Sequence, residues 1–224
     1  MCAQFEQNFV RIENLLELCV IIRPYLPTLT KALRPLVVPK TPASVLVANG
    51  PALAVESMQF GLLPRWSKEA SVKFATHNAR LETIEEKPTF KDAFRKRHCV
   101  VPMSGFSEPI YTGNLAGNMV AFEPTQEALF AAGIWEEWVN KGTGEIIQSF
   151  SVITSEPLKF VSQTGHDRSP LFLTESDGVE WLRNEQASDE QLKLFLTEHR
   201  HSPELTASVH RPLKDGWQKR APKG

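Results

Sequence analysis

The chain has 224 residues, of which 42% are hydrophobic and 23% charged, and its formal net charge at pH 7 is −1. These values are typical of a soluble globular protein of one large domain, and they exclude a protein that is basic throughout. Three cysteines, Cys2, Cys19 and Cys99, are too few for a disulfide scaffold and favour a reducing cytoplasm. The sequence shows neither a signal peptide nor an apolar run long enough to span a bilayer, so no membrane partner is expected.

Apolar spacing predicts most of the regular elements in chain order. Residues 12–22 have helical periodicity and are followed by Pro24 and Pro27. Residues 45–48 and 52–55 flank Asn49-Gly50-Pro51 and predict a β-hairpin whose turn is altered by the proline. Further strands are predicted at 58–63, 98–102, 119–123, 128–135 and 148–154.

Three later segments predict helices, and the end of the chain predicts a tail. Residues 89–96 form a short helix in this prediction, and helices at 176–183 and 189–199 open with capping residues. Residues 218–224 are basic and contain proline, so they are predicted to be flexible. The mixture of elements predicts an α+β fold with a largely antiparallel β-sheet core.

Cys2, directly after Met1, is a candidate nucleophile. If Met1 is removed, Cys2 carries a free α-amine and a thiol, whose ordinary pKa values are about 8 and about 8.5. Such an aminothiol condenses with an aldehyde: the amine forms an imine, and the thiolate then closes a five-membered thiazolidine. Taken alone, a cysteine near a terminus is weak evidence, and an incidental residue is the simpler interpretation.

Three polar clusters lie among the apolar segments, at residues 77–83, 102–109 and 164–170. Each also has a structural interpretation: Asn78 as a capping residue, Glu108 as a solvated carboxylate and His166 as a surface histidine. None of the clusters has metal-ligand spacing, and no dinucleotide, phosphate-loop or GxSxG motif is present. We therefore expect neither a metal nor a cofactor.

The chain resembles the SRAP family, the SOS-response-associated peptidase domain that includes the abasic-site processing proteins. The resemblance depends on ordered blocks between Cys2 and about Pro170, and no single block would be specific. The blocks are Met1-Cys2, RP at 34–35 with PKTPA at 39–43, FGLLPRW at 60–66, NARLET at 78–83, RHCVVP at 97–102 with GFSE at 105–108, and GHDRSP at 165–170.

The resemblance implies a single SRAP-like domain over residues 1–224, with motifs in 2–170, C-terminal helices in 176–199 and a barrel-like sheet flanked by helices. It also implies that Cys2, Asn78, Glu108 and His166 form the catalytic centre. The chain departs from the family pattern around these residues, for example at Ala3-Gln4, Phe60, Ser107, Pro109 and Ser169. These changes concern DNA affinity more than the central chemistry.

The resemblance further implies a DNA-repair enzyme of the SOS response that crosslinks to abasic sites in single-stranded DNA. Glu108 in a partly apolar cleft would have a raised pKa and would move protons during opening of the sugar ring. His166 is the second proton-transfer candidate, and Asn78 would orient the Cys2 amine or the sugar oxygens. The thiazolidine would protect the lesion from strand scission by β-elimination. The resemblance implies an enzyme of a lyase-like class.

The DNA-binding prediction comprises Arg80, Trp66, Phe60, Arg65, Thr154 and Arg168. Arg80 would clamp a phosphate, and its structural alternative is a salt bridge with Glu82 or Glu85. Trp66 would stack on bases. Core packing is the alternative for both aromatic residues, and it suits Phe60 better.

Two other functions are compatible with the same residues. In an N-terminal-nucleophile thiol peptidase or amidase, Cys2 attacks an amide, Asn78 stabilises the oxyanion and Met1 is removed autocatalytically. In a non-catalytic single-stranded DNA-binding module, Cys2 is incidental. The sequence predicts a monomeric cytoplasmic protein of bacterial or phage type that associates with the nucleoid when bound to DNA.

Overall fold

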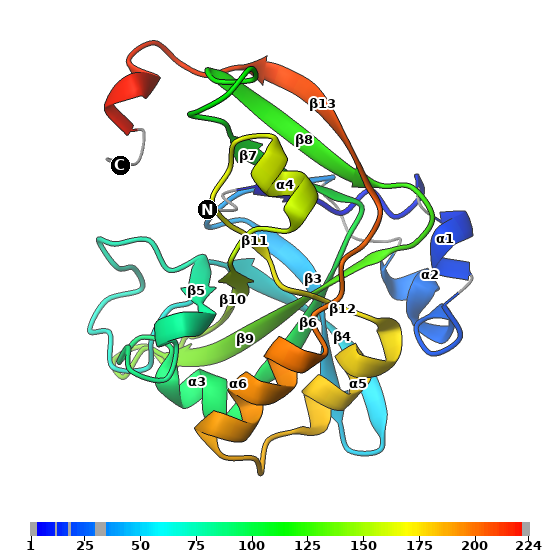
Figure 1. Cartoon of the computed structure of the whole chain (residues 1–224). Coiled ribbons are helices and arrows are strands. Elements are labelled where there is room, and N and C mark those ends of the chain that lie inside the picture. The colour runs from blue at the N-terminus through cyan, green and yellow to red at the C-terminus, as the bar shows by residue number, and fades with distance from the viewer. Residues whose placement is uncertain (1–3, 12, 18, 30–34, 221–224) are drawn as a thin grey trace.

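The computed structural model describes residues 4–11, 13–17, 19–29 and 35–220 and shows a mixed fold rich in strands (Figure 1). The strands are β1 (Gln4–Glu6), β2 (Leu36–Val37), β3 (Pro42–Asn49), β4 (Ala52–Phe60), β5 (Asn78–Arg80), β6 (His98–Met103), β7 (Gly105–Pro109), β8 (Asn118–Pro124), β9 (Leu129–Val139), β10 (Ile146–Ser155), β11 (Ser169–Pro170), β12 (Phe172–Leu173) and β13 (Leu205–Pro212). The α-helices are α1 (Glu13–Glu17), α2 (Leu26–Leu29), α3 (Lys91–Lys96), α4 (Lys159–Gln163), α5 (Glu175–Arg183) and α6 (Asp189–Glu198). The 3₁₀ helices are η1 (Arg23–Tyr25), η2 (Leu81–Thr83) and η3 (Trp217–Arg220).

Five strands close into a barrel. Strand β10 pairs with β4, β4 with β3, β3 with β6, β6 with β9, and β9 returns to β10. The β4–β10 pairing is parallel and the other four are antiparallel. Closure removes the exposed strand edges that an open sheet of this size would present. The α+β class and the barrel-like antiparallel core predicted from the sequence are thereby confirmed.

The β3–β4 hairpin shows why the sequence prediction works at this point. Asn49 pairs with Ala52, so the loop consists of Gly50 and Pro51. Gly50 has a φ of 58°, and the proline ring holds its own φ near −65°. A positive φ at the first loop position alone is the requirement of a type II′ turn, which suits the twist of a hairpin.

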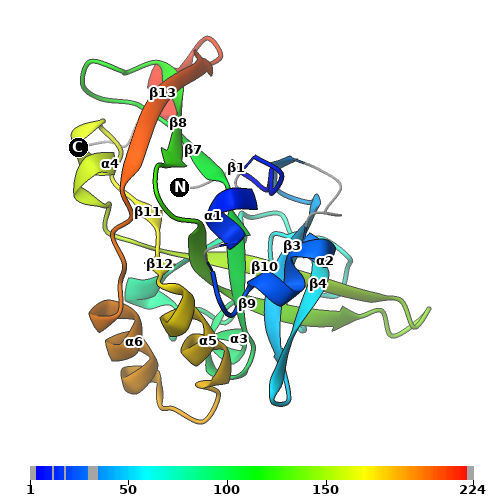
Figure 2. The same ribbon diagram turned by 90° about the vertical axis from the view of Figure 1, so that its right-hand side faces the viewer.

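A second, antiparallel sheet packs against the barrel in the order β13-β8-β7-β1-β2. The barrel and this sheet enclose an apolar core that contains Phe5, Phe60, Phe106, Phe122 and Phe150. Figure 2 shows β7, β8 and β13 standing to one side of the barrel, while the β9–β10 hairpin extends beyond it.

Helices α3, α5 and α6 pack on the side of the barrel away from the second sheet (Figures 1 and 2). Trp181 of α5 is fully buried there, and its indole donates a hydrogen bond to the Gly133 carbonyl at 3.1 Å. Thr174 caps α5, and Ser188 with Gln191 forms a capping box at the start of α6. The predicted helices at 176–183 and 189–199 are therefore confirmed to within a residue at each end.

The predicted helix at 12–22 is wrong in its second half, because α1 ends at Glu17. The backbone N–H groups of Ile21 and Ile22 donate to the Glu175 carboxylate at 2.8 and 2.7 Å. These donors are satisfied by a side chain distant in sequence, so this segment does not need helical hydrogen bonds. The β-branched pair followed by Pro24 also has low helix propensity.

Other differences concern strands. Residues 58–60 continue β4 and are not the separate strand predicted at 58–63. The sequence does not predict β13, because seven of its eight residues are exposed and it lacks an apolar alternation. Of the predicted tail, residues 218–220 belong to η3, and 221–224 lie outside the described residues. Among the described helices, none has the length and apolar character needed to cross a membrane.

Candidate active site and DNA-binding surface

One strand, β10, brings two of the predicted motifs together. Its residues Val152–Thr154 pair in parallel with Asn78–Arg80 of β5, and Thr154 also pairs with Pro170 of β11. Residues 78–83 and 165–170, which are far apart in the sequence, therefore meet at the C-terminal end of β10. Asn78 is buried at this junction, while Arg80, two residues further along the strand, is exposed.

The third motif reaches the same place from the second sheet. Strand β7 carries Glu108, whose side chain is fully buried. A carboxylate oxygen of Glu108 lies 3.3 Å from Nε2 of His166, which is also buried. The structure thus brings together two of the predicted proton-transfer groups in a site shielded from solvent.

An imidazole ordinarily has a higher pKa than a carboxyl group, and burial reverses this order for His166 and Glu108. Burial raises the pKa of Glu108 to about 7, because a carboxylate loses hydration in the interior. It lowers the pKa of His166 to about 4 for the same reason. Between these values the proton resides on the carboxyl group, and the imidazole is neutral.

The backbone around His166 fixes its ring. Nδ1 lies 2.9 Å from the carbonyl oxygen of Arg168 and 3.1 Å from the Arg168 backbone nitrogen. When Nδ1 carries the ring proton, it donates to that carbonyl, and the lone pair of Nε2 faces Glu108. A protonated Glu108 can then donate its hydrogen to Nε2. The pair can hold one proton and pass it to a substrate oxygen or nitrogen.

The N-terminal strand runs beside Glu108. Gln4 of β1 pairs with Ser107 of β7, and Phe5 pairs with Phe106. The predicted nucleophile Cys2 lies outside the described residues.

Trp66 forms an exposed aromatic pair with Phe74. Trp66 is 54% and Phe74 51% exposed, and their rings are stacked with centroids 6.5 Å apart. The Trp66 indole donates to the Pro88 carbonyl at 3.1 Å, which holds the ring in place. Both residues belong to the loop at 61–77 that leads into β5, so the pair lies along the approach to Asn78.

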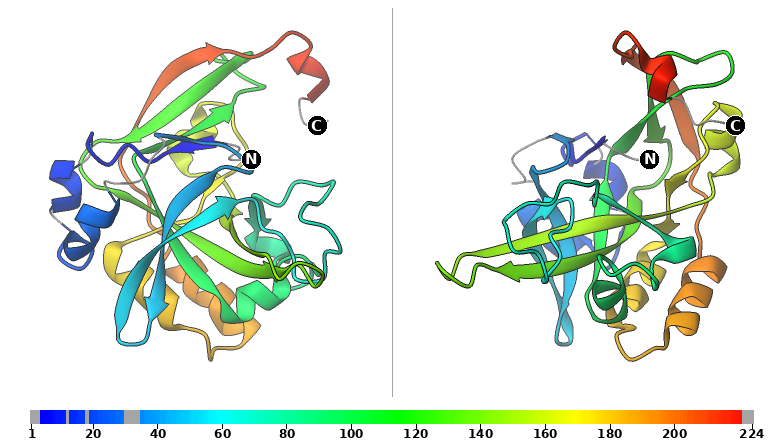
Figure 3. Two further views of the ribbon diagram at one scale, coloured as in Figure 1. Left: turned by 180° about the vertical axis from the view of Figure 1, so that it is seen from behind. Right: turned by 90° about the vertical axis from the view of Figure 1, so that its left-hand side faces the viewer.

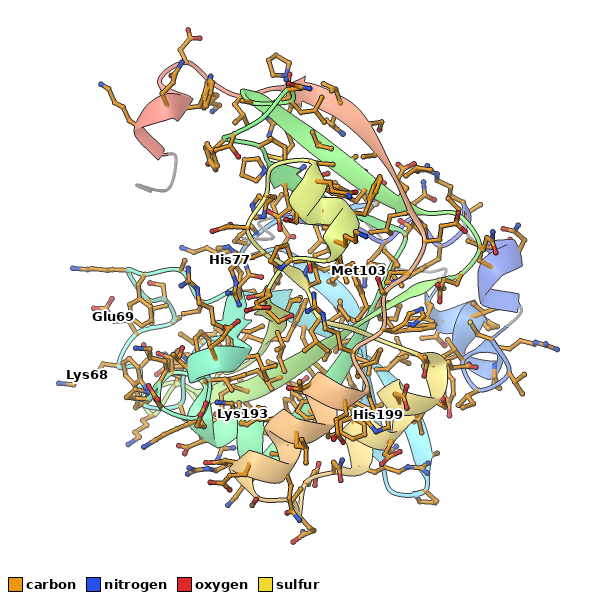
Figure 4. The ribbon with its side chains drawn as sticks, in the orientation of Figure 1. Lys68, Glu69, His77, Met103, Lys193 and His199 are labelled. Atoms are coloured by element: carbon orange, nitrogen blue, oxygen red, sulfur yellow. The ribbon has the colours of Figure 1, made fainter. Side chains whose placement is uncertain are left out.

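A cavity of about 290 Å³ adjoins this loop. Its walls include Phe74 and His77 together with Phe60 and Lys40. His77 directly precedes Asn78, and Figure 4 shows it on the side of the molecule from which Lys68 and Glu69 project. Phe74 and His77 are not among the residues predicted from the sequence. The signal for Phe74 is an aromatic side chain within the largely polar stretch 67–78, and His77 opens the polar cluster at 77–83.

Three of the predicted DNA-binding residues are corrected by the structure. Phe60 is fully buried and packs on Phe5 and Phe150, with ring centroids 5.0 and 5.3 Å away, so it is a core residue. Thr154 is also fully buried. Arg168 donates to the Thr154 carbonyl and to Glu82, both at 2.8 Å, so its guanidinium braces the site.

The other two predicted DNA-binding arginines differ in whether they form an ion pair. Arg65 is 62% exposed and pairs with the buried Glu136 at 3.0 Å. Arg80 is exposed and forms no ion pair with any described residue. Its two predicted structural partners are engaged elsewhere: Glu82 binds Arg168 and Glu85 binds Lys193. The salt bridges considered for Arg80 are therefore absent from the described part of the chain.

Metal binding depends on donor side chains that lie close together. Among the described residues, no group of three or more His, Cys, Asp or Glu residues could hold a metal ion.

Comparison with known proteins decides the family. The family described as SOS response associated peptidase (SRAP) matches residues 1–211. The chain belongs to the SRAP family. This SRAP chain is 29% identical over 161 residues to the abasic site processing protein YoaM of Bacillus subtilis, covering 71% of the chain and 70% of that protein. It is 32% identical over 188 residues to the abasic site processing protein HMCES of Mus musculus, covering 67% of the chain and 53% of that protein.

Solved structures share the SRAP fold seen here. A protein from Bordetella bronchiseptica matches with a TM-score of 0.69 and 21% identity, covering 94% of the chain and 100% of that structure. A protein from Bacteroides thetaiotaomicron matches with a TM-score of 0.66 and 24% identity, covering 97% and 94%. At these identities the likeness concerns the arrangement of the backbone alone.

Proposed function

We propose that this protein processes abasic sites by covalent capture in single-stranded DNA, through a thiazolidine formed by Cys2 after removal of Met1. The observation that carries the proposal is the buried Glu108–His166 pair, 3.3 Å apart, beside the strand that begins two residues after Cys2. The relatives named abasic site processing proteins supply the substrate class. An abasic sugar contains the aldehyde with which an N-terminal aminothiol condenses.

The first step opens the closed form of the abasic sugar. A base removes the proton from the O1′ hydroxyl, the C1′–O4′ bond breaks as C1′=O1′ forms, and O4′ receives a proton. Glu108 suits both transfers because its pKa of about 7 makes the protonated and ionised forms comparable near neutrality. His166, held neutral by burial, accepts a hydrogen bond from protonated Glu108 and orients that carboxyl group.

The second step joins the protein to the sugar. The neutral amine of Cys2 adds to C1′ and water leaves, with a proton supplied to its oxygen, so that an imine forms. The thiolate of Cys2 then adds to the imine carbon, the C–S bond forms and the nitrogen takes up a proton. The balance is one aldehyde and one aminothiol giving one thiazolidine and one water. Asn78, buried beside the junction, has the donors and acceptor needed to orient these groups.

The exposed groups near the site suit a single strand. Arg80 is exposed and within electrostatic reach of Glu82 but forms no ion pair with a described residue, so it can bind a phosphate. The Trp66–Phe74 pair offers a surface for bases, and stacking contributes about 1–3 kcal/mol per base without sequence readout. Bases are available for such stacking only when they are unpaired, which favours single-stranded DNA.

The experiment that tests this proposal compares the wild type with Cys2→Ser on an oligonucleotide that carries one abasic site. We expect a heat-stable adduct for the wild type, because the thiazolidine is closed by sulfur. Cys2→Ser retains an amine that can form an imine, so its adduct should be lost on heating. An adduct of equal durability in Cys2→Ser would refute the thiazolidine.

The family description supports one alternative, a thiol peptidase. In that reaction Cys2 attacks an amide carbonyl and expels an amine, and no DNA is required. The wild type and Cys2→Ser, assayed on a peptide and on abasic DNA, distinguish the two functions. A thiol peptidase cleaves the peptide in the absence of DNA, and this cleavage requires Cys2. The proposed function predicts no cleavage and an adduct only with abasic DNA.

A further inference from the structure

The C-terminal arm, defined as residues 210–219, lies in one of two strongly basic stretches of this nearly neutral chain; the other is residues 87–97. Residues 210–224 contain five Lys or Arg and one Asp, a net charge of +4, which leaves −5 on the other residues of a chain with net charge −1. Arg211, Lys214 and Lys219 of the arm are exposed. None of them forms an ion pair within the described part of the chain.

This freedom contrasts with several arginines elsewhere in the chain. Arg168 is bound to Glu82, Arg95 to Asp189 and Arg97 to Glu136. A phosphate competes poorly for a guanidinium that already has a carboxylate partner, because the bond to that carboxylate must be broken first. The unpaired cations of the arm are therefore better suited to bind an anionic ligand than these three paired arginines.

The arm is anchored at defined points. The backbone N–H of Leu213 donates to the Gly117 carbonyl at 2.8 Å. The indole of Trp217 lies so close to Gly117 that a Cβ at that position would be 3.1 Å from the ring. The Trp217 ring also contacts Tyr111, with centroids 6.3 Å apart. These contacts hold the cations against the β7–β8 loop, residues 110–117.

The same loop contacts the candidate active site. It continues directly from β7, which carries Glu108, and its Thr112 hydroxyl donates to the Gly165 carbonyl at 3.1 Å, one residue before His166. The right-hand view in Figure 3 shows η3 on the same side of the molecule as the loop 61–77, and Figure 1 agrees. A strand that leaves the site on this side would meet the arm.

We propose that the C-terminal arm binds the phosphates of a DNA strand, outside the nucleotides that occupy the candidate active site. This inference rests on the proposed function for the identity of the ligand. The match to the SRAP family ends at residue 211, so Lys214 and Lys219 belong to a segment beyond the matched residues. Residues 210–219 include no exposed large apolar side chain, which makes a membrane surface a poorer fit than a phosphate backbone.

The test measures binding of undamaged single-stranded DNA against salt concentration, on strands of about 5 and about 20 nucleotides. The variant is Lys214→Ala/Lys219→Ala. The matched control is Lys96→Ala/Lys141→Ala, which removes the same charge from exposed positions on α3 and in the β9–β10 turn. All binding is measured on the whole chain.

We expect the salt dependence of DNA affinity to be weaker in the arm variant than in the wild type, and only on the long strand. Two lost phosphate contacts reduce the slope of log affinity against log salt by about 1.4, at about 0.7 per contact on single strands. Between 50 and 200 mM salt, the wild type should then lose about sevenfold more affinity than the arm variant. The control should keep the wild-type slope.

Two outcomes would overturn the inference. The arm variant could keep the wild-type salt slope on the long strand, or the salt slope of the control could fall as much as that of the arm variant. Equal loss on the short strand would also contradict it, since that strand is too short to reach the arm. These measurements use undamaged DNA. A failure of the proposed function would instead appear as a wild-type protein that forms no adduct with abasic DNA.

Discussion

At the scale of single residues, the Glu108–His166 pair is the feature with the clearest chemical consequence. Both side chains are buried and lie 3.3 Å apart, so neither can ionise at its ordinary pKa. General acids and bases in enzymes often have pKa values that burial has shifted. Here the shifts leave a carboxyl group with a pKa of about 7 and a neutral imidazole.

Replacement of Glu108 by glutamine should change stability in a pH-dependent way. The folded protein retains the Glu108 proton up to a pKa of about 7, whereas the unfolded chain releases it near the ordinary value of 4.5. Folding therefore binds a proton between these values, and ionisation of Glu108 destabilises the folded state as pH rises through that window. Glu108→Gln cannot ionise, so its Tm should exceed that of the wild type at pH 8 and nearly match it at pH 4.5.

Thermal unfolding across pH checks this expectation, with Glu204→Gln as the control for removal of an exposed carboxylate. Single-turnover crosslinking of the same Glu108→Gln variant should be slower by about 10²–10⁴-fold, the usual cost of a lost acid–base group. A wild-type rate at every pH would make Glu108 a structural residue and leave the proton transfers to His166.

Arg80 should contribute to DNA affinity without sequence preference. Its guanidinium is exposed, and both carboxylates considered as its partners bind other cations. We expect Arg80→Ala to weaken binding of different single strands by a similar factor and to reduce the salt slope by about 0.7. Lys96→Ala, at an exposed position on α3, is the control. Unchanged affinity in Arg80→Ala would show that this residue does not contact DNA.

At the scale of elements, the contact between the β7–β8 loop and the loop before His166 positions the proton-transfer pair. Gly165 has a φ of 98°, and a Cβ there would overlap the carbonyl oxygen of Thr112. Gly165→Ala must therefore move one loop away from the other, in addition to the backbone strain of a positive φ. Since Thr112 follows Glu108 and Gly165 precedes His166, the shift should separate the pair.

We expect Gly165→Ala to slow crosslinking by at least about tenfold, because displacements of about 1 Å in a reacting geometry cost up to about 10²-fold. Gly113→Ala is the matched control: Gly113 lies in the β7–β8 loop that Gly165 contacts, it has a φ of 74°, and a Cβ there meets no atom within 4 Å. The control should carry the backbone strain and keep the rate. Similar loss in both variants would attribute the effect to strain alone.

Much of this arrangement can be predicted from the sequence, because local rules decide it. The turn at Gly50-Pro51 and the Ser188 cap of α6 use residue types that favour one backbone conformation, whereas α5 begins after Thr174 and not at the predicted Ser176. The motifs that carry Asn78, Glu108 and His166 are likewise recognisable in the amino-acid sequence alone. The family likeness adds the expectation that they meet.

What could not be predicted depends on contacts between distant segments. Glu175 accepts from Ile21 and Ile22 and ends the helical pattern there, although these residues are more than 150 positions apart. Arg168 binds Glu82, so a side chain expected to face DNA supports the site. Strand β13 is mostly exposed and pairs along β8 through its backbone, which leaves no apolar pattern to detect.

At the scale of the whole molecule, closure of the barrel creates one site from three separate parts of the chain. The site lies where β10 leaves the barrel and pairs with β5 and β11, while β7 approaches from the second sheet. The Trp66–Phe74 pair belongs to the loop before β5, and the β7–β8 loop connects the site to the C-terminal arm. The segments to which we attribute lesion chemistry and strand binding are therefore neighbours in a chain with little net charge.

The measurement that tests the central proposal most directly is the intact mass of the product formed with a single-stranded oligonucleotide carrying one abasic site. We predict one adduct per chain, with the mass of the protein without Met1 plus the oligonucleotide less one water molecule. Treatment with borohydride should leave that mass unchanged, because a thiazolidine has no C=N bond to reduce. An adduct that gains two hydrogens on reduction, that retains Met1, or that does not form would contradict the proposal.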